Sequence, residues 1–195
     1  MTSLYFVRHA QPDYRTGVDS TYALSAEGIE DRMQACNTLK DIRLDVCVCS
    51  PYRRSIDTVI PIVQGHNLEI ITDIRLRERD KGKGISNTHE MFRKRWKDFS
   101  FCEEGGESLS ECQKRNIEAV KDILKKYENK NVLIGTHGTA LSTIINYYDD
   151  SFGIEYFLRI INYMPYVVRL DFINDKFAGM EELAFVEKEF HGQKQ

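Results

Sequence analysis

Short apolar runs alternate with longer amphipathic segments along the chain. The short runs are rich in valine, isoleucine and leucine and end at turn-forming or polar residues, which favours strands. They cover Leu4–Val7, Val46–Cys49, Leu68–Thr72, Asn131–Gly135, Val167–Phe172 and Lys176–Ala178. Helical spacing predicts helices over Ala26–Leu39, Ser50–Val63, Asn87–Lys97, Leu141–Ile145 and Gly153–Ile161, and from a Ser-x-x-Glu capping box at Ser108 to Tyr127. This alternation predicts an α/β three-layer sandwich in which helices flank a mainly parallel central sheet.

The residues at the helix starts predict how two of the helices are capped and packed. Ser25 is expected to cap the first helix, with Ile29, Met33 and Cys36 on one apolar face. Ser50 is expected to cap the second helix, with Pro51 in its first turn. Both helices would then follow directly from the ends of polar loops.

Composition narrows the class of protein. A chain of 195 residues with 42% hydrophobic residues is expected to form a single domain over 1–195. The net charge of −3, without a long basic run, argues against a nucleic-acid partner. Apolar stretches such as Val132–Ile134 are far too short to span a membrane, and no signal-peptide core follows the N-terminus. Five cysteines without a disulfide or zinc pattern fit reduced thiols, so we expect a cytoplasmic protein.

Polar side chains that could take part in binding or catalysis follow several of the predicted strands. The pair Arg8–His9 follows the first strand, the pair Arg53–Arg54 stands at the start of the second helix, and His137 follows a late strand. Glu78 lies in a charged loop. The carboxyl ends of parallel strands meet at one edge of a sheet. Guanidinium and imidazole groups gathered near a helix N-terminus are suited to binding a phosphoryl group.

The order of short motifs along the chain carries a resemblance to a known family. Arg-His-x-Gln, Ser-Pro-x-x-Arg, Leu-x-Glu-Arg, Gly-Glu-Ser and His-Gly follow one another from the first strand to the last helices. Together they resemble the histidine phosphatase superfamily, which contains phosphatases and phosphoglycerate mutases. The resemblance covers nearly the whole chain and implies a phosphoglycerate-mutase-like fold.

The resemblance also implies the roles of the central residues. It makes His9 the phosphoacceptor and Glu78 the proton donor. It makes Arg8, Arg54 and His137 the pocket for the phosphoryl group, and its spacing selects Arg54 over its neighbour. These five residues are the catalytic set that the resemblance predicts.

Four further positions are expected to bind substrate: Gln11, Arg15, Ser50 and Gly138. Gln11 matches the polar residue that often follows the Arg-His pair, and Ser50 matches a supporting position of the family. Arg15 stands about where the family commonly has an asparagine. Ala10 is a second departure, since the family usually has glycine there.

The expected activity is metal-independent hydrolysis of a phosphomonoester, through a phosphohistidine intermediate, on a small phosphorylated metabolite. No cofactor is expected. The alternatives are a phosphoglycerate-mutase-type phosphotransferase and a non-catalytic phosphate-binding member of the fold. Glu107 competes with Glu78 for the acid role, although a carboxylate at a helix start is its more ordinary interpretation. The segment 81–107 is expected to form a lid.

Overall fold

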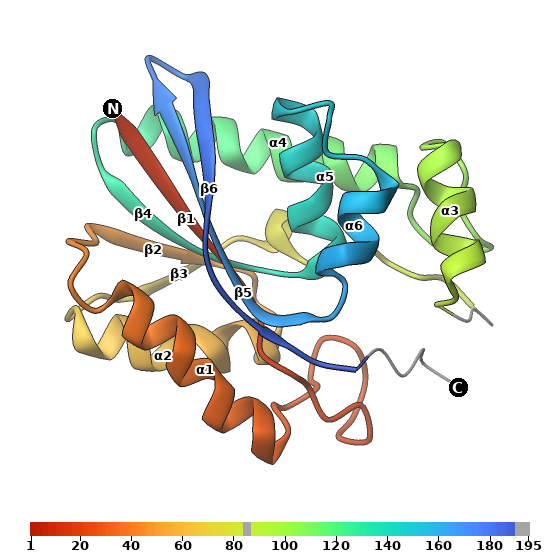
Figure 1. Ribbon diagram of the computed structural model, residues 1–195, viewed down its shortest axis with the longest axis horizontal. Helices are drawn as coiled ribbons and strands as arrows, with labels where there is room; N and C mark the ends of the chain where they lie inside the picture. Colours follow the sequence, from red (N-terminus) through yellow and green to blue (C-terminus); the bar gives the residue numbers. More distant parts are fainter. Residues whose placement is uncertain (84–86, 190–195) are drawn as a thin grey trace.

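The computed structural model describes residues 1–83 and 87–189, and these residues form a six-stranded sheet with helices on both faces (Figure 1). The strands are β1 (Thr2–Arg8), β2 (Val46–Cys49), β3 (Ile70–Thr72), β4 (Asn131–Thr136), β5 (Tyr163–Ile173) and β6 (Lys176–Glu187). Their order across the sheet is β3-β2-β4-β1-β5-β6. The predicted α/β sandwich is therefore confirmed.

The sheet is parallel over most of its width. Strand β4 pairs in parallel with both β1 and β2, and β2 pairs in parallel with β3. Strands β5 and β6 form an antiparallel hairpin that is added to the sheet through β1. Since β1, β2 and β4 run the same way side by side, the residues that follow them emerge at one edge of the sheet.

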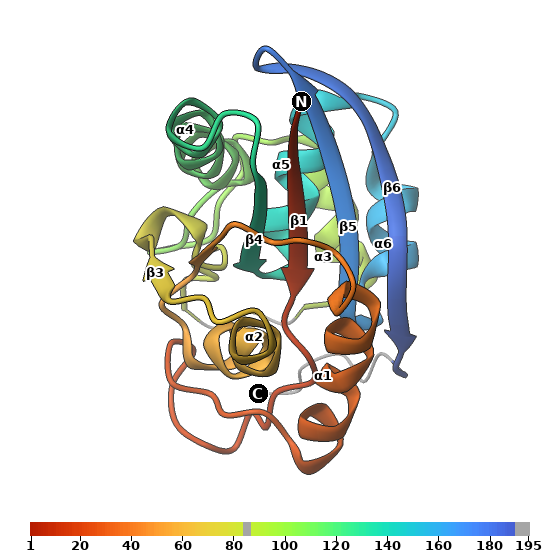
Figure 2. The ribbon, with the colours of Figure 1, turned by 90° about the vertical axis from the view of Figure 1, so that its left-hand side faces the viewer.

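Side chains alternate between the two faces of the sheet, and each face has its own helical layer. The helices are α1 (Ala26–Leu39), α2 (Arg53–Gly65), α3 (His89–Lys97), α4 (Leu109–Lys126), α5 (Gly138–Tyr148) and α6 (Ile154–Ile160). Leu4 and Phe6 of β1 pack in the core with α4, α5 and α6, whereas Tyr5 and Val7 pack with α1 and α2. Figure 2 shows these helices on opposite sides of the strands.

Two details of helix packing and capping differ from the sequence predictions. Ser25 caps α1 as expected, by accepting a hydrogen bond from the amide of Gly28. Ile29 and Met33, however, are 48% and 41% exposed, because the buried side of α1 is formed by smaller residues and by Leu39. The predicted apolar face was therefore wrong for Ile29 and Met33, whereas Cys36 packs against the core. An apolar residue marks a buried face only when the neighbouring element approaches from that side.

The start of α2 is the second correction. Its N-cap is Tyr52, which offers no capping side chain, and the helix begins at Arg53. Ser50 is not the cap, because it lies three positions before the first helical residue and its hydroxyl group has another partner. Pro51 likewise lies outside the helix. The capping box predicted at Ser108, in contrast, is present at the start of α4.

The segment 81–107 contains α3 and an irregular connection to α4, and its residues 84–86 lie outside the described residues. Two arginines, Arg79 just before the segment and Arg95 on α3, both form ion pairs with Glu103. All three side chains are almost completely buried. This ion triad ties α3 and the connection to the loop that carries Glu78. Whether the segment works as a lid stays a prediction.

Candidate active site

A pocket of about 860 Å³ lies beyond the carboxyl ends of the parallel strands. Arg8 and His9 reach it from the end of β1, and Arg54 reaches it from the first turn of α2. Glu78 comes from the loop after a single 3-10 turn, η1 (Ile74–Leu76). The structure thus brings together four of the five residues of the predicted catalytic set at the wall of one pocket.

The ring of His9 is held in one tautomer. Its Nδ1 atom lies 2.8 Å from the carbonyl oxygen of Ala10, and the residue is 5% exposed. Because a carbonyl oxygen only accepts hydrogen bonds, Nδ1 carries the proton and Nε2 keeps its lone pair. Burial, followed by the charges of Arg54 and Arg8, holds the pKa of His9 well below its usual range. His9 is therefore a neutral imidazole whose free nitrogen can act as a nucleophile.

His137 is fully buried directly behind His9. The two ring centroids are 5.2 Å apart, and Nε2 of His137 lies 2.8 Å from the hydroxyl oxygen of Ser50. The same oxygen accepts a hydrogen bond from the backbone amide of Tyr52 at 3.3 Å. Nδ1 of His137 has no hydrogen-bond partner among the described residues.

Neither His137 nor Ser50 reaches the pocket surface in this structure. Burial, followed by the charges of Arg54 and His9, holds the pKa of His137 well below its usual range. The contact with His9 places both residues in a supporting layer. Ser50 orients the imidazole of His137, which in turn packs against the imidazole of His9.

Arg8 is anchored by carbonyl groups rather than by a carboxylate. Its Nη1 atom donates to the carbonyl oxygens of Ile160 and Ile161 at 2.8 and 3.0 Å, and its buried Nε atom has no partner among the described residues. The guanidinium lies against Gly138, where an added Cβ would come within 3.0 Å of the Arg8 Cζ atom. The absence of a side chain at Gly138 thus lets the Arg8 guanidinium pack against the start of α5. Because its partners are carbonyl oxygens, the positive charge of Arg8 remains available to bind an anion.

Arg54 and its neighbour Arg53 point to different places. Arg54 is 3% exposed and lines the pocket, where it contacts the carbonyl oxygen of Asp19 and pairs with the Asp19 carboxylate at 3.3 Å. The guanidinium also lies over the rings of Tyr52 and Tyr22. Arg53 is 59% exposed at its side chain and pairs with Asp57. Only Arg54 can therefore meet a bound ligand.

The carboxylate of Glu78 caps the N-terminus of α5. Its Oε2 atom accepts a hydrogen bond from the backbone amide of Thr139, and its Oε1 atom accepts hydrogen bonds from the backbone amides of Ala140 and Arg79. All three are 2.8–3.1 Å long. Oε2 accepts only one of these bonds, so it can also carry a proton. The capping geometry sets the carboxyl group at the same helix start that follows His137.

A clamp from α4 holds the backbone around Glu78. Arg115 donates to the carbonyl oxygens of Arg75, Arg77 and Glu78 at 2.6–3.1 Å and to both oxygens of Glu107 at 2.6 and 2.8 Å. Burial alone would raise the pKa of Glu107, but the hydrogen bonds and charge of Arg115 lower it below its usual range. Glu107 is therefore a structural carboxylate that lies outside the pocket wall, which disfavours the acid role.

The remaining expected substrate-binding residues divide into two groups. Gln11 lines the pocket, and its buried Oε1 atom has no partner among the described residues. Arg15 does not reach the pocket, because its side chain is 89% exposed and pairs with Asp13 at 2.8 Å. Its spacing from the Arg-His pair suggested a substrate contact, but the loop turns it outward.

Sequence reasoning missed several charged residues of the site, among them Asp19, Lys81 and Arg115. Asp19 and Lys81 line the pocket, and Arg115 holds the Glu78 loop. Asp19 and Lys81 lie in irregular loops, where no periodic pattern indicates which side chains point inward. For Arg115 a signal existed, since it follows Cys112 by three positions and precedes Ala119 by four on the buried face of α4.

Burial lowers the pKa of Lys81, and the charges of Asp19 and Glu78 oppose that shift. No group of three or more His, Cys, Asp or Glu side chains is placed to hold a metal ion within residues 1–83 and 87–189. In the same residues, no helix is long and apolar enough to cross a membrane.

Comparisons with known proteins agree with this geometry. An uncharacterised phosphatase, PhoE of Bacillus subtilis, is 28% identical over 149 residues, which are 74% of this chain and 76% of that protein. A probable phosphoglycerate mutase, GpmB of Proteus mirabilis, is 27% identical over 161 residues, or 75% and 74% of the two chains. The solved structure of Bacillus stearothermophilus YhfR superposes with a TM-score of 0.75 at 23% identity, over 98% of this chain and 99% of that one. The profile of the histidine phosphatase superfamily (branch 1) matches residues 4–180, so the chain belongs to that superfamily.

Proposed function

We propose that this protein hydrolyses phosphomonoesters of small metabolites without a metal ion, through a phosphohistidine intermediate on His9. The observation that carries the proposal is the neutral imidazole of His9, with its Nε2 lone pair available, in a pocket whose wall also holds buried Arg8 and Arg54. The superfamily contains phosphatases and phosphoglycerate-mutase-like proteins, and both chemistries require a nucleophile next to a phosphate pocket.

In the first step, Nε2 of His9 attacks phosphorus as the bond from phosphorus to the ester oxygen breaks. The electron pair of that bond stays on the ester oxygen, which takes a proton from Glu78 and leaves as the alcohol. Arg8 and Arg54 balance the charge of the phosphoryl oxygens. The hydrogen bond from Nδ1 to the carbonyl oxygen of Ala10 stabilises the positive charge that develops on the imidazole ring.

In the second step, a water molecule attacks the phosphorus atom and gives a proton to the Glu78 carboxylate. The bond between nitrogen and phosphorus breaks, its electron pair returns to Nε2 of His9, and inorganic phosphate is released. Glu78 is then protonated again, and the protein is ready for another cycle. The guanidinium groups supply the charge that a divalent ion supplies in many phosphoryl-transfer enzymes, which supports metal-independent chemistry.

The test is a rapid-quench experiment with phosphorus-labelled p-nitrophenyl phosphate and the wild-type protein. An acid-labile label should appear on the protein before phosphate is released, and His9→Ala should carry none. His66→Ala is a matched control, because its imidazole hydrogen-bonds the Leu39 carbonyl oxygen at the C-terminal end of α2, outside the pocket wall. An acid-stable label, or full turnover by His9→Ala, would disprove the nucleophile.

The same assay distinguishes the proposed function from three alternatives: a metal-dependent mechanism, a mutase and a non-catalytic protein. Loss of activity in excess chelator, with recovery on adding a divalent ion, would refute the metal-free mechanism. Transfer of the label to a second hydroxyl group, rather than to water, would identify a mutase. Binding of phosphate without release of p-nitrophenol would identify a non-catalytic member of the fold.

A further inference from the structure

The pocket continues well beyond the cations that surround His9. Six of the apolar side chains that line it are called the apolar wall below: Phe92, Trp96, Leu109, Phe157, Ile160 and Met164. They come from α3, the first residue of α4, α6 and the start of β5. Arg79, Lys81 and Arg95 line the pocket as well. A phosphoryl group fills only a small part of a pocket of this size. The apolar wall is therefore left to meet the rest of a substrate.

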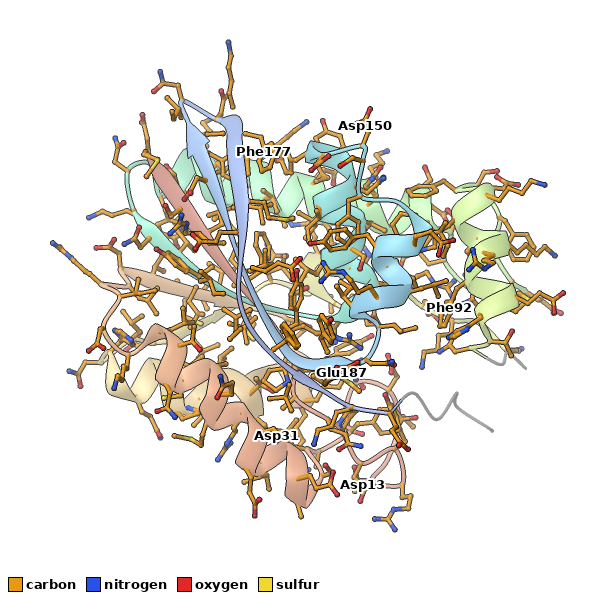
Figure 3. All side chains as sticks on the ribbon, in the orientation of Figure 1. Asp13, Asp31, Phe92, Asp150, Phe177 and Glu187 are labelled. Atoms are coloured by element: carbon orange, nitrogen blue, oxygen red, sulfur yellow. The ribbon has the colours of Figure 1, made fainter. Side chains whose placement is uncertain are left out.

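The apolar wall is built on packed helices. Phe92 and Trp96 contact Phe157 with ring centroids 5.2 and 5.4 Å apart, and Figure 3 shows Phe92 on the side of α3 that faces α6. An ion pair between Arg93 and Glu155 also joins the two helices. Such aromatic contacts hold the wall in place before a ligand arrives, so little ordering is needed on binding.

The charges of the pocket indicate what the rest of the substrate carries. Among the described residues, five basic side chains and three carboxylates line the pocket, and a fourth carboxylate, Glu103, pairs with two of those basic groups. With Glu78 protonated for the first step, the excess is two positive charges. A phosphomonoester dianion balances that excess. A second acidic group on the substrate would add charge that the pocket does not compensate.

We propose that the apolar wall is the subsite for the alcohol part of the substrate, and that this part is uncharged and apolar, as in alkyl or aryl phosphomonoesters. The inference rests on the proposed function, because it assumes that the phosphoryl group sits against His9. It names the substrate class of that site. Phosphorylated hydroxy acids and amino acids would bind less well, since their carboxylate would lie against apolar side chains.

The test measures binding separately from turnover. A series of n-alkyl phosphates from ethyl to hexyl keeps the reacting group nearly constant while the apolar area grows. We expect kcat/KM of the wild type to rise roughly threefold to fourfold per methylene group until the wall is covered. Calorimetric titration of His9→Ala with the same series should show a parallel gain in affinity, and phosphoserine should bind more weakly than butyl phosphate.

Met164→Gln should flatten the slope of the series, because it keeps the volume of the side chain but makes the wall polar. Met33→Gln is the matched control, since Met33 is exposed on α1 and lies outside the pocket. A flat series in titration and turnover, or tighter binding of phosphoserine, would overturn the proposal. If the wild type turns over no ester but titration keeps the slope, the proposed function fails and the apolar subsite stands.

Discussion

Arg115→Met tests whether the clamp from α4 positions Glu78. The wild-type side chain is 14% exposed and donates to three backbone carbonyls and to the Glu107 carboxylate, whose side chain is 11% exposed. Methionine fills much of the same volume but donates no hydrogen bond. The variant therefore removes the charge and the hydrogen bonds while it keeps most of the packing.

Removing one partner of a buried, hydrogen-bonded ion pair typically costs about 3–5 kcal/mol. Arg77 also pairs with Glu107, at 3.3 Å, so the carboxylate keeps one partner and we expect a loss near the lower limit, about 3 kcal/mol. A domain with a stability of roughly 5–15 kcal/mol would remain folded. The effect on catalysis is separate, since displacing a reacting group by about 1 Å can cost on the order of 100-fold in rate.

The assays are urea unfolding and single-turnover kinetics with an alkyl phosphate and with p-nitrophenyl phosphate. The alkyl ester should suffer the larger loss, because its leaving oxygen depends more on the proton from Glu78. Arg53→Met is the control, and its exposed ion pair with Asp57 should be worth less than about 1 kcal/mol. Equal small losses in both variants, or equal rate losses for both esters, would refute the positioning role.

Two further predictions concern the buried imidazoles and the packing of Arg8. The folded state keeps His9 and His137 neutral while the unfolded chain protonates them below about pH 6.5, so their contribution to stability is complete above that pH and falls as the pH drops, by up to about 1.4 kcal/mol per pH unit for each imidazole. The difference between the urea midpoints at pH 6.5 and 5.5 should shrink in His9→Asn, where His137 still contributes, and an unchanged difference would contradict the assignment. Gly138→Ala should lower kcat/KM for p-nitrophenyl phosphate by roughly 10-fold, because the new Cβ displaces Arg8 by a few tenths of an ångström. Gly65→Ala, where nothing lies within 4 Å, should leave kcat/KM unchanged, and equal values for both variants would show that Arg8 tolerates the shift.

The strands that carry the site were predictable because their signal is local. The strand Val46–Cys49 has the predicted bounds, and β4 extends its prediction by one residue, to Thr136. Both strands are buried on both faces, so their sequences are nearly continuous apolar runs. Strand β6 was predicted over Lys176–Ala178 but continues to Glu187. It lies at the edge of the sheet, and its partner β5 stabilises a sequence whose apolar residues are interrupted by Gly179, Glu181 and Glu182.

The site residues were predictable to different degrees for a related reason. His9 and His137 directly follow strands, so the position of each strand end determines where each residue lies. Arg15 lies in a loop, where its direction depends on local bonds to Asp13 that motif spacing does not encode. Lys81 reaches the pocket from another loop and gives no periodic signal. Motifs tied to regular elements therefore predict position, whereas loop residues need the tertiary structure.

The site contains buried polar atoms without hydrogen-bond partners, which the cores of stable proteins usually avoid. Arg8 is buried with an unpartnered Nε atom, His137 is buried with an unpartnered Nδ1 atom, and both unpartnered polar atoms destabilise the free protein. A core selected for stability alone would replace them with apolar side chains. Donors held in place before a ligand arrives need no rearrangement when phosphoryl charge appears. The cost of burying the charged Arg8 is thus the physical reason to expect an anion against it, and the clamp through Arg115 and the ion triad at Glu103 stabilise the loops around that site.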